Sequence, residues 1–326
     1  MGSLLWLCVI FLPIIASARP LWMVGDDYIL HADSKGHEVH RWSVGAKSWG
    51  FDPQGCRLWV QDGESVALFF PTGTRHSVPL NVTLVSDQIA NAIFLLDGTT
   101  LIRADANGVL QERSTDPAFA QLKRVVPAAC GFWGVQREGR GSLTMLEISH
   151  SLKLAQKTEL AKGHELWARE KLLPGLDGMV WLGYSITTPS AIYSPRVDLI
   201  RPGGDIVATS AFQGKGLFFD ACVAPDDRLV VSRDLAGSSE FTVPISSFVD
   251  AIDREGRTET LFAADTNQLI DAVACSTQSV FLAQHSILGG GNTRLSRIDF
   301  AHPKTETFLT SLPGTVRALY LCEGGP

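Results

Sequence analysis

The sequence predicts an all-β fold, a seven-bladed β-propeller of four-stranded antiparallel blades, on three observations. A strand–turn–strand hairpin recurs seven times, and successive hairpins begin on average about 44 residues apart, a spacing that suits a four-stranded propeller blade. A short apolar strand precedes each hairpin. The C-terminal segment has no hairpin of its own and resembles the one strand that the first blade lacks. Rings of six or eight blades are the structural alternatives.

The segment 269–312 shows all four strands of one predicted blade, which we letter A to D from the channel outward. Strand A is expected at 270–275, strand B at 280–284, strand C at 294–300 and strand D at 306–310. Each is rich in β-branched, aromatic or aliphatic residues and is bounded by Ser, Gly, Asn or Pro.

The C–D hairpins cover the chain between its two ends. Several of their turns carry Asp followed within three residues by Gly, which supplies the positive φ that tight turns need. The seven hairpins begin at Tyr28, Val66, Thr100, Leu143, Val197, Phe248 and Arg294.

The first blade is predicted to take its strand A from the other end of the chain. Its strand B, 21–24, has no apolar strand upstream, whereas 316–322 matches strand A of the last blade. Pairing both ends of the chain in one sheet closes the ring and removes the free edges that would otherwise favour aggregation.

The N-terminal 18 residues are predicted to be a signal peptide. An apolar run at 4–15 is followed by Ala16, Ser17 and Ala18, the small-residue pattern of a cleavage site. No Lys or Arg precedes the run, so an uncleaved anchor is the alternative, although about 12 apolar residues are few for a membrane span. We expect residues 19–326 to form one secreted or periplasmic propeller domain without stable membrane insertion.

Charge and cysteine content restrict the partners and the chemistry. A formal net charge of −6 disfavours nucleic acid and anionic lipid as partners. An odd number of cysteines without tight spacing predicts buried thiols rather than a disulfide framework, and a disulfide between neighbouring blades, first of all Cys275–Cys322, is the alternative. The cysteines beyond residue 18 are Cys56, Cys130, Cys222, Cys275 and Cys322.

The segments DACVAPDDRLVV and FVDAIDREGRTETLF resemble repeats of the NHL and SMP-30/gluconolactonase-like propellers, most closely over 220–262. The resemblance implies calcium-dependent lactone or ester hydrolysis, with Asp220 and Asp271 as the candidate metal ligands. However, no Glu-Gly-Pro opens the first blade and no Asn-Gly precedes a strand A, so two expected ligands have no counterpart. Propellers serve as hydrolases, lyases and binding proteins alike. No cofactor is therefore expected for the main interpretation, and Ca²⁺ belongs to the alternative.

The starts of the seven A strands are predicted to form a ring of side chains at one mouth of the channel. We located them by counting back 11 positions from an apolar residue in each strand B, and by direct match for the C-terminal strand. Basic and acidic positions adjoin in this ring, which favours a polar binding site, with a purely structural ring of salt bridges as the alternative. The positions in order are Arg317, Trp49, Leu84, Arg124, Lys171, Asp220 and Asp271.

Three connections between strands B and C, at 183–196, 232–247 and 285–293, are long, and long loops in a compact repeat commonly carry function. We expect their side chains to overhang the acidic side of the mouth. The residues concerned are Tyr184, Tyr193, Arg233, Asp234, Phe241 and His285.

The histidines His31, His37 and His40 lie together in the first blade. Positions 37 and 40 of a strand face opposite sides, so this cluster predicts a solvated outer strand rather than a metal pair. No G-x-S-x-G elbow, P-loop or dinucleotide motif is present, which disfavours serine hydrolases and nucleotide enzymes. The sequence thus predicts an exported propeller that binds a polar ligand or a protein partner at the channel mouth, with a lactonase-like hydrolase or lyase as the alternative.

Overall fold

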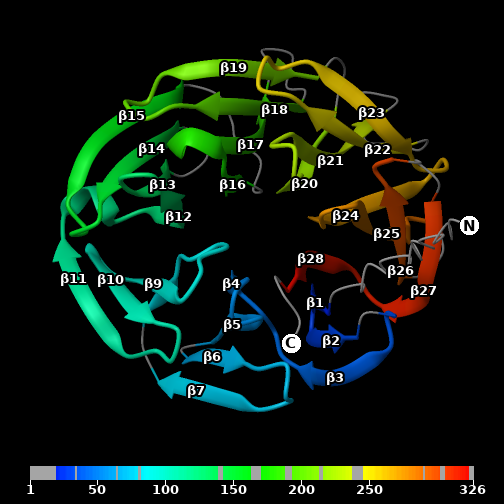
Figure 1. The fold of residues 1–326 in the computed structure, drawn as a ribbon, viewed down its shortest axis with the longest axis horizontal. Coiled ribbons are helices and arrows are strands. Elements are labelled where there is room, and N and C mark those ends of the chain that lie inside the picture. Colours follow the sequence, from blue (N-terminus) through cyan, green and yellow to red (C-terminus); the bar gives the residue numbers. More distant parts are fainter. Residues whose placement is uncertain are drawn as a thin grey trace, which may run out of the picture.

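The computed structural model describes residues 20–33, 35–63, 65–79, 82–138, 142–162, 170–187, 193–212, 216–236, 245–288, 291–301 and 305–322. Within these residues the strands form seven four-stranded antiparallel sheets, and Figure 1 shows them arranged as the blades of a ring. The predicted seven-bladed propeller is confirmed. The predicted signal peptide, 1–18, lies outside the described residues.

Each blade runs from an innermost strand A to an outermost strand D (Figure 1). Blades 1 and 2 consist of β28 (Val316–Leu321), β1 (Leu21–Gly25), β2 (Tyr28–Ala32) and β3 (Glu38–Ser43), then β4 (Ser48–Asp52), β5 (Arg57–Asp62), β6 (Ser65–Phe69) and β7 (Arg75–Pro79). Blades 3 and 4 consist of β8 (Thr83–Leu84), β9 (Ala92–Asp97), β10 (Thr100–Asp105) and β11 (Leu110–Thr115), then β12 (Leu122–Ala128), β13 (Gly131–Glu138), β14 (Ser142–Ser149) and β15 (Leu154–Lys162).

Blades 5 to 7 complete the ring, and two short 3-10 helices lie at Pro117–Phe119 and Leu176–Gly178. Blade 5 consists of β16 (Lys171–Pro174), β17 (Val180–Thr187), β18 (Tyr193–Ile200) and β19 (Ile206–Ala211). Blades 6 and 7 consist of β20 (Phe218–Val223), β21 (Leu229–Ala236), β22 (Ile245–Ile252) and β23 (Thr258–Ala263), then β24 (Gln268–Cys275), β25 (Ser279–Ser286), β26 (Asn292–Asp299) and β27 (Thr305–Pro313). No helix in the described part of the chain is long and apolar enough to cross a membrane.

The burial pattern explains why the inner strands read as continuous apolar runs. Every residue of β1 and β2 is buried, whereas the outermost strand β3 is mostly exposed. A middle strand packs against the adjacent blade on each of its two faces, so both sets of alternating side chains must be apolar. Between blades 1 and 2 the core contains Trp22, Phe51 and Tyr320, and the last two rings stack with centroids 4.9 Å apart.

The two ends of the chain meet in blade 1, as predicted. Strand β28 pairs antiparallel with β1, with Leu21 opposite Leu321 and Val24 opposite Ala318. The C-terminal strand therefore supplies the innermost strand of the first blade and closes the ring (Figure 1).

Four cysteines form two disulfides between neighbouring blades, so the expectation of buried thiols is wrong for them. Cys56 pairs with Cys322 across a Cα–Cα distance of 4.8 Å, and Cys222 pairs with Cys275 across 5.5 Å. The pairing Cys275–Cys322 is also wrong. Each strand A has a neighbour on both sides, and the direction of the side chain, which spacing does not give, decides which neighbour it reaches. Cys130 is free and exposed.

Candidate functional site

A cavity of about 390 Å³ lies where several A strands begin, at one end of the ring's centre. Five members of the predicted ring line it, namely Trp49, Arg124, Lys171, Asp220 and Arg317. Eight of its 13 lining residues are charged, four acidic and four basic, so the cavity is polar and electrically balanced. The lining residues that sequence reasoning missed are Asp26, Lys47, Asp87, Glu170, Phe219, Thr315, Ala318 and Tyr320.

Lys171 is held between two buried carboxylates at the bottom of this cavity. Its Nζ lies 3.2 Å from Oδ1 of Asp220 and 3.8 Å from Oδ1 of Asp87, and it stands 5.5 Å from the ring centroid of Tyr320. Burial by itself would lower the pKa of Lys171, but the two carboxylates outweigh burial and raise that pKa above its ordinary value. The side chain is therefore a buried cation across the neutral pH range.

The two carboxylates come from different blades, so the lysine links blades that are not adjacent in sequence. Asp220 lies in strand A of blade 6, two residues after its start at Phe218, and its Oδ2 also accepts a hydrogen bond from the backbone N of Val273 in blade 7, at 3.1 Å. Asp87 follows strand β8 of blade 3, on the other side of the centre. The arrangement ties blades 3, 5, 6 and 7 together around one charge.

Arg124 is balanced differently from Lys171. Its Nη1 donates to the carbonyl oxygens of Trp49, at 3.0 Å, and Ser86, at 3.5 Å, and its guanidinium lies 5.8 Å from the Trp49 ring centroid. Within the described residues it forms no ion pair with a carboxylate. Its positive charge is thus oriented by backbone dipoles and an aromatic face while it lines the cavity.

Three further charged residues of the lining, Asp26, Glu170 and Arg317, form ion pairs. Arg317 Nε lies 2.6 Å from Asp26 Oδ1, with both side chains about two-fifths exposed, and Glu170 lies 3.2 Å from Nη1 of Arg137, which is outside the lining. The exposed Arg317–Asp26 pair contributes little to stability. The Arg137–Glu170 pair is more buried and joins Glu170 to a cation outside the lining.

Asp87, rather than the predicted Leu84, supplies the residue of blade 3 in the cavity. Leu84 is 1% exposed and packs in the core. Strand β8 has only two residues, and the chain beyond it bridges in parallel to the A strands of both neighbouring blades, Ser86 to Val125 and Phe51 to Gln88. This continuation carries the channel position three residues further along the chain, where no count from strand B could locate it.

Asp271 does not line the cavity, which corrects the predicted ring. It sits at a bulge in β24, is 3% exposed, and its carboxylate contacts Nδ1 of His285 on the neighbouring strand β25. The turn before strand B is one residue shorter in blade 7 than in blade 6, because Cys275 pairs with Val280 whereas Val223 pairs with Leu229. Counting back a constant 11 residues therefore lands one position away from the equivalent of Asp220, on the other face of the strand.

The suggested calcium pair, Asp220 and Asp271, does not assemble as a metal site in the described part of the chain. Asp220 faces the ammonium group of Lys171, and Asp271 contacts His285. Neither belongs to a cluster of three or more close potential metal ligands among the described residues. A buried ammonium group thus lies where the resemblance would place a cation.

The residues predicted to overhang the mouth lie mostly inside the blades. Tyr184 is 1% exposed and donates to Oδ2 of Asp198 at 2.6 Å. Arg233 lies 2.6 Å from Asp250 Oδ2, between two phenylalanine rings 4.7 Å away. Asp234 accepts from the backbone N of Leu217, and burial raises the pKa of Asp234 to about 6.

The reason is that the segments taken for long loops are largely extended strands. Strand β17 continues to Thr187, β21 to Ala236 and β25 to Ser286, and β18 already begins at Tyr193. These extensions pair within their own blades. Their side chains therefore stand on the faces of the sheets instead of overhanging the mouth. The tips at 188–192 and 237–244, which include Phe241, and at 289–290 lie outside the described residues.

The predicted solvated outer strand is right for two of the three histidines. His37 is exposed and directly precedes the outermost strand β3, and His40 is half-buried on β3 itself. His31, however, lies on β2 and is 5% exposed. Burial, followed by the nearby His40, lowers the pKa of His31 to about 4, so its imidazole is neutral at neutral pH.

A second cavity of about 320 Å³ lies where the A strands end. It is lined by Pro53, Gln88, Leu173, Pro174, Cys222, Val223, Pro225, Ala274, Cys275, Ser276, Thr277, Leu319, Tyr320 and Leu321, without a charged side chain among them. Tyr320 lines both this cavity and the charged one.

Comparison with known proteins shows the fold class. No protein-family model and no curated protein sequence matches the chain. The β-propeller domain of Cps50 (Swd1) from Myceliophteria thermophila superposes with a TM-score of 0.56 at 11% identity, covering 86% of this chain and 91% of that one. A variant of the apocarotenoid oxygenase of Synechocystis reaches 0.58 at 10% identity, covering 94% and 91%.

A catalytically inactive virginiamycin B lyase from Staphylococcus aureus, solved with quinupristin, gives a TM-score of 0.56 at 8% identity and covers 83% of this chain and 94% of that one. Identities this low show the fold alone. The chain is therefore a β-propeller protein, and its function must be argued from its own site.

Proposed function

We propose that this protein is a binding module that holds an anionic or zwitterionic group, from a small polar ligand or from a loop of a partner protein, in the charged cavity at the channel mouth. The observation that carries the proposal is the unequal balancing of two of the four cations that line the cavity, Lys171 and Arg124. Lys171 is neutralised by Asp220 and Asp87, whereas Arg124 lines the same cavity and donates to backbone carbonyl oxygens, without a carboxylate partner in the described residues.

The geometry favours a carboxylate or similar planar anion at Arg124. A guanidinium presents several N–H donors in one plane, which match the two oxygens of a carboxylate. Trp49 beside Arg124 offers an aromatic face for the apolar part of the same ligand. The carboxylates of Asp87 and Asp220, which flank Lys171 in the same cavity, would orient an attached ammonium or amide group.

Export to an oxidising compartment, after cleavage behind Ala18, is part of this proposal. The two disulfides support it, because disulfides persist mainly outside the reducing cytosol. Intact-mass analysis of the mature protein should give an N-terminus at Arg19, and a mature chain that starts at Met1 would contradict cleavage.

The binding proposal is tested with a panel of amino acids, dicarboxylates and short acidic peptides, screened by thermal shift and then measured by calorimetry. The Arg124→Gln variant should bind the best of these roughly 10- to 150-fold more weakly, the equivalent of one charge-assisted hydrogen bond of about 1.5 to 3 kcal/mol. Arg201→Gln is the matched control, because Arg201 is exposed and pairs with Asp205 away from the cavity. Unchanged affinity in Arg124→Gln, with the fold intact, would exclude this cavity as the site.

A further inference from the structure

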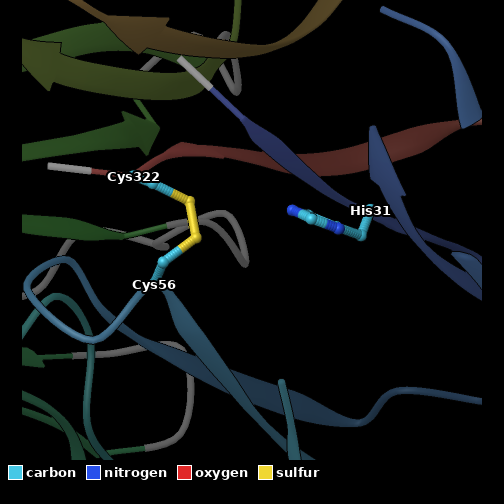
Figure 2. Close-up of side chains that lie close together, drawn as sticks. All are labelled: His31, Cys56 and Cys322. Atoms are coloured by element: carbon cyan, nitrogen blue, oxygen red, sulfur yellow. A yellow bond between two sulfur atoms is a disulfide. The ribbon is translucent and has the colours of Figure 1, made fainter. Parts of the chain in front are cut away.

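A second group of chemistry-bearing side chains lies between blades 1 and 2, away from the charged cavity. His31 on β2 lies near the disulfide formed by Cys56 and Cys322, and Figure 2 shows its ring directed toward the two sulfur atoms. One ligand atom from each of the three residues falls within 4.8 Å of the other two. In the described residues this is the one cluster of three or more His, Cys, Asp or Glu side chains with that geometry.

His31 lacks the hydrogen bonds that a buried imidazole normally has. It is 5% exposed, and neither of its ring nitrogens has a hydrogen-bond partner among the described residues. Leaving a polar group buried and unpaired costs about 1 to 3 kcal/mol. The orphaned nitrogens and the nearby sulfur atoms are independent observations, and both indicate a ligand that is absent in the disulfide form.

The surroundings hold the three side chains in position. The Trp22 ring lies 4.7 Å from the His31 ring, and its Nε1 donates to the carbonyl oxygen of Cys56 at 3.1 Å and to Sγ of Cys56 at 3.4 Å. Cys322 is 1% exposed, directly after the closing strand β28. The site is therefore preformed and lies at the junction that closes the ring, with His31 and Cys322 buried and Cys56 partly exposed.

We propose that His31, Cys56 and Cys322 form a redox-gated site for a soft closed-shell metal ion, Cu⁺ or Zn²⁺, which binds when the disulfide is reduced. Two thiolates and one imidazole are the ligands that these ions prefer. Three donors complete a Cu⁺ site, while Zn²⁺ would take a water as its fourth ligand. Which of the two ions binds more tightly is a result of the test.

The electron and proton balance of the switch is simple. A dithiol reductant gives two electrons and two protons to the Cys56–Cys322 bond and becomes a disulfide itself. The metal ion then displaces the two thiol protons and is held by two thiolates and the neutral His31 ring. Reoxidation by a disulfide partner removes two electrons from the sulfurs, forms the S–S bond again and releases the ion.

The chain contains its own control. The other disulfide, Cys222–Cys275, also joins neighbouring blades, but no histidine of the described residues forms a ligand cluster with it. The proposed chemistry therefore predicts metal binding at one reduced cysteine pair and not at the other.

The test uses the full-length chain carrying Cys8→Ser, Cys130→Ser, Cys222→Ser and Cys275→Ser, which leaves Cys56 and Cys322 as its only cysteines. The protein is reduced with a phosphine under nitrogen and titrated with Cu⁺ or Zn²⁺ against a coloured chelator. One ion per chain should bind to the reduced form and none to the oxidised form. His31→Ala should weaken binding by at least 10- to 100-fold, and His31→Cys should restore it.

The matched control carries Cys8→Ser, Cys130→Ser, Cys56→Ser and Cys322→Ser and should bind no stoichiometric ion after reduction. Equal affinity in His31→Ala, or no ion bound by the reduced protein, would overturn the proposal. If reduction unfolds the chain, circular dichroism should show that Cu⁺ or Zn²⁺ restores the folded state of the parent but not of His31→Ala. Failure of the ion to restore it would equally count against the site.

Discussion

The two ends of the central channel differ in chemistry although the same A strands form both. Among the described residues, eight of the 13 that line the end where these strands begin are charged, whereas none that line the cavity at the other end is charged, and that cavity includes the Cys222–Cys275 disulfide. Tyr320 of the closing strand β28 lines both cavities. One end of the ring is thus rich in charge, and the other is held by covalent and uncharged contacts.

The difference follows from what connects to each end. The A strands are entered from the outer strand of the preceding blade, by connections that bring in polar residues such as Glu170, just before β16. They leave through short turns into strand B, where register and packing allow few choices. Functional side chains can therefore vary at the entry end without disturbing the blades.

The largest effect should come from removing the strand that separates the two ends. Deletion of residues 315–326 removes β28, exposes the edge of β1 and takes Tyr320 out of both cavities. We expect loss of the cooperative unfolding transition in urea. Deletion of 323–326 alone keeps β28 and Cys322 and serves as the control, and a 315–326 deletion with unchanged thermal stability would refute the ring closure.

The next largest loss of stability is expected at the charged end, where Lys171 is the cation held between two buried carboxylates. Lys171→Met should cost about 3 to 5 kcal/mol of unfolding free energy, because Asp220 and Asp87 are left buried without a cation. Adding Asp220→Asn should recover part of that loss. Because the pKa of Lys171 is raised on folding, its contribution is fully present below the ordinary lysine pKa and is lost only above it. A loss below about 1 kcal/mol would mean that the network is not a structural element.

At the uncharged end the two disulfides should contribute unequally. Cys56–Cys322 joins residues 266 positions apart and Cys222–Cys275 residues 53 positions apart. In the chain-entropy description each contributes about 2 to 5 kcal/mol, and the longer loop adds about 1.4 kcal/mol more. Urea denaturation of the two Cys→Ser double variants measures the difference. Peptide mapping that found Cys275 joined to Cys322 would contradict the pairing itself.

The smallest effect is expected from a change at Asp271, which does not line the charged cavity. Asp271→Asn weakens its contact with His285 and should cost about 1 to 3 kcal/mol of stability without changing ligand affinity. Asp220→Asn, in the cavity, should change both quantities. If Asp271→Asn weakened binding to the same extent as Asp220→Asn, the assignment of Asp271 to the interior of blade 7 would be wrong.

The fold could be predicted in detail from the sequence because its evidence is local and repeated. Seven hairpins with turn residues between apolar strands give the number of blades, and the unmatched 316–322 segment gives the ring closure. The cavity could be predicted only in part. Counting along strands predicts Trp49, Arg124, Lys171 and Asp220, since strand positions repeat with a constant period, and direct match of the C-terminal strand predicts Arg317.

The rest depended on features that a count does not contain. A turn shortened by one residue moved Asp271 to the other face of its strand, and the short strand β8 replaced Leu84 by Asp87. The disulfide partners, and the position of His31 beside Cys56 and Cys322, depend on which neighbouring blade each side chain faces. Those blades can come from distant parts of the sequence. The sequence by itself determined the repeat and its closure through local hydrophobic patterning. Only the tertiary structure decided which side chains meet, because a one-residue change in register reverses the face on which a strand residue lies.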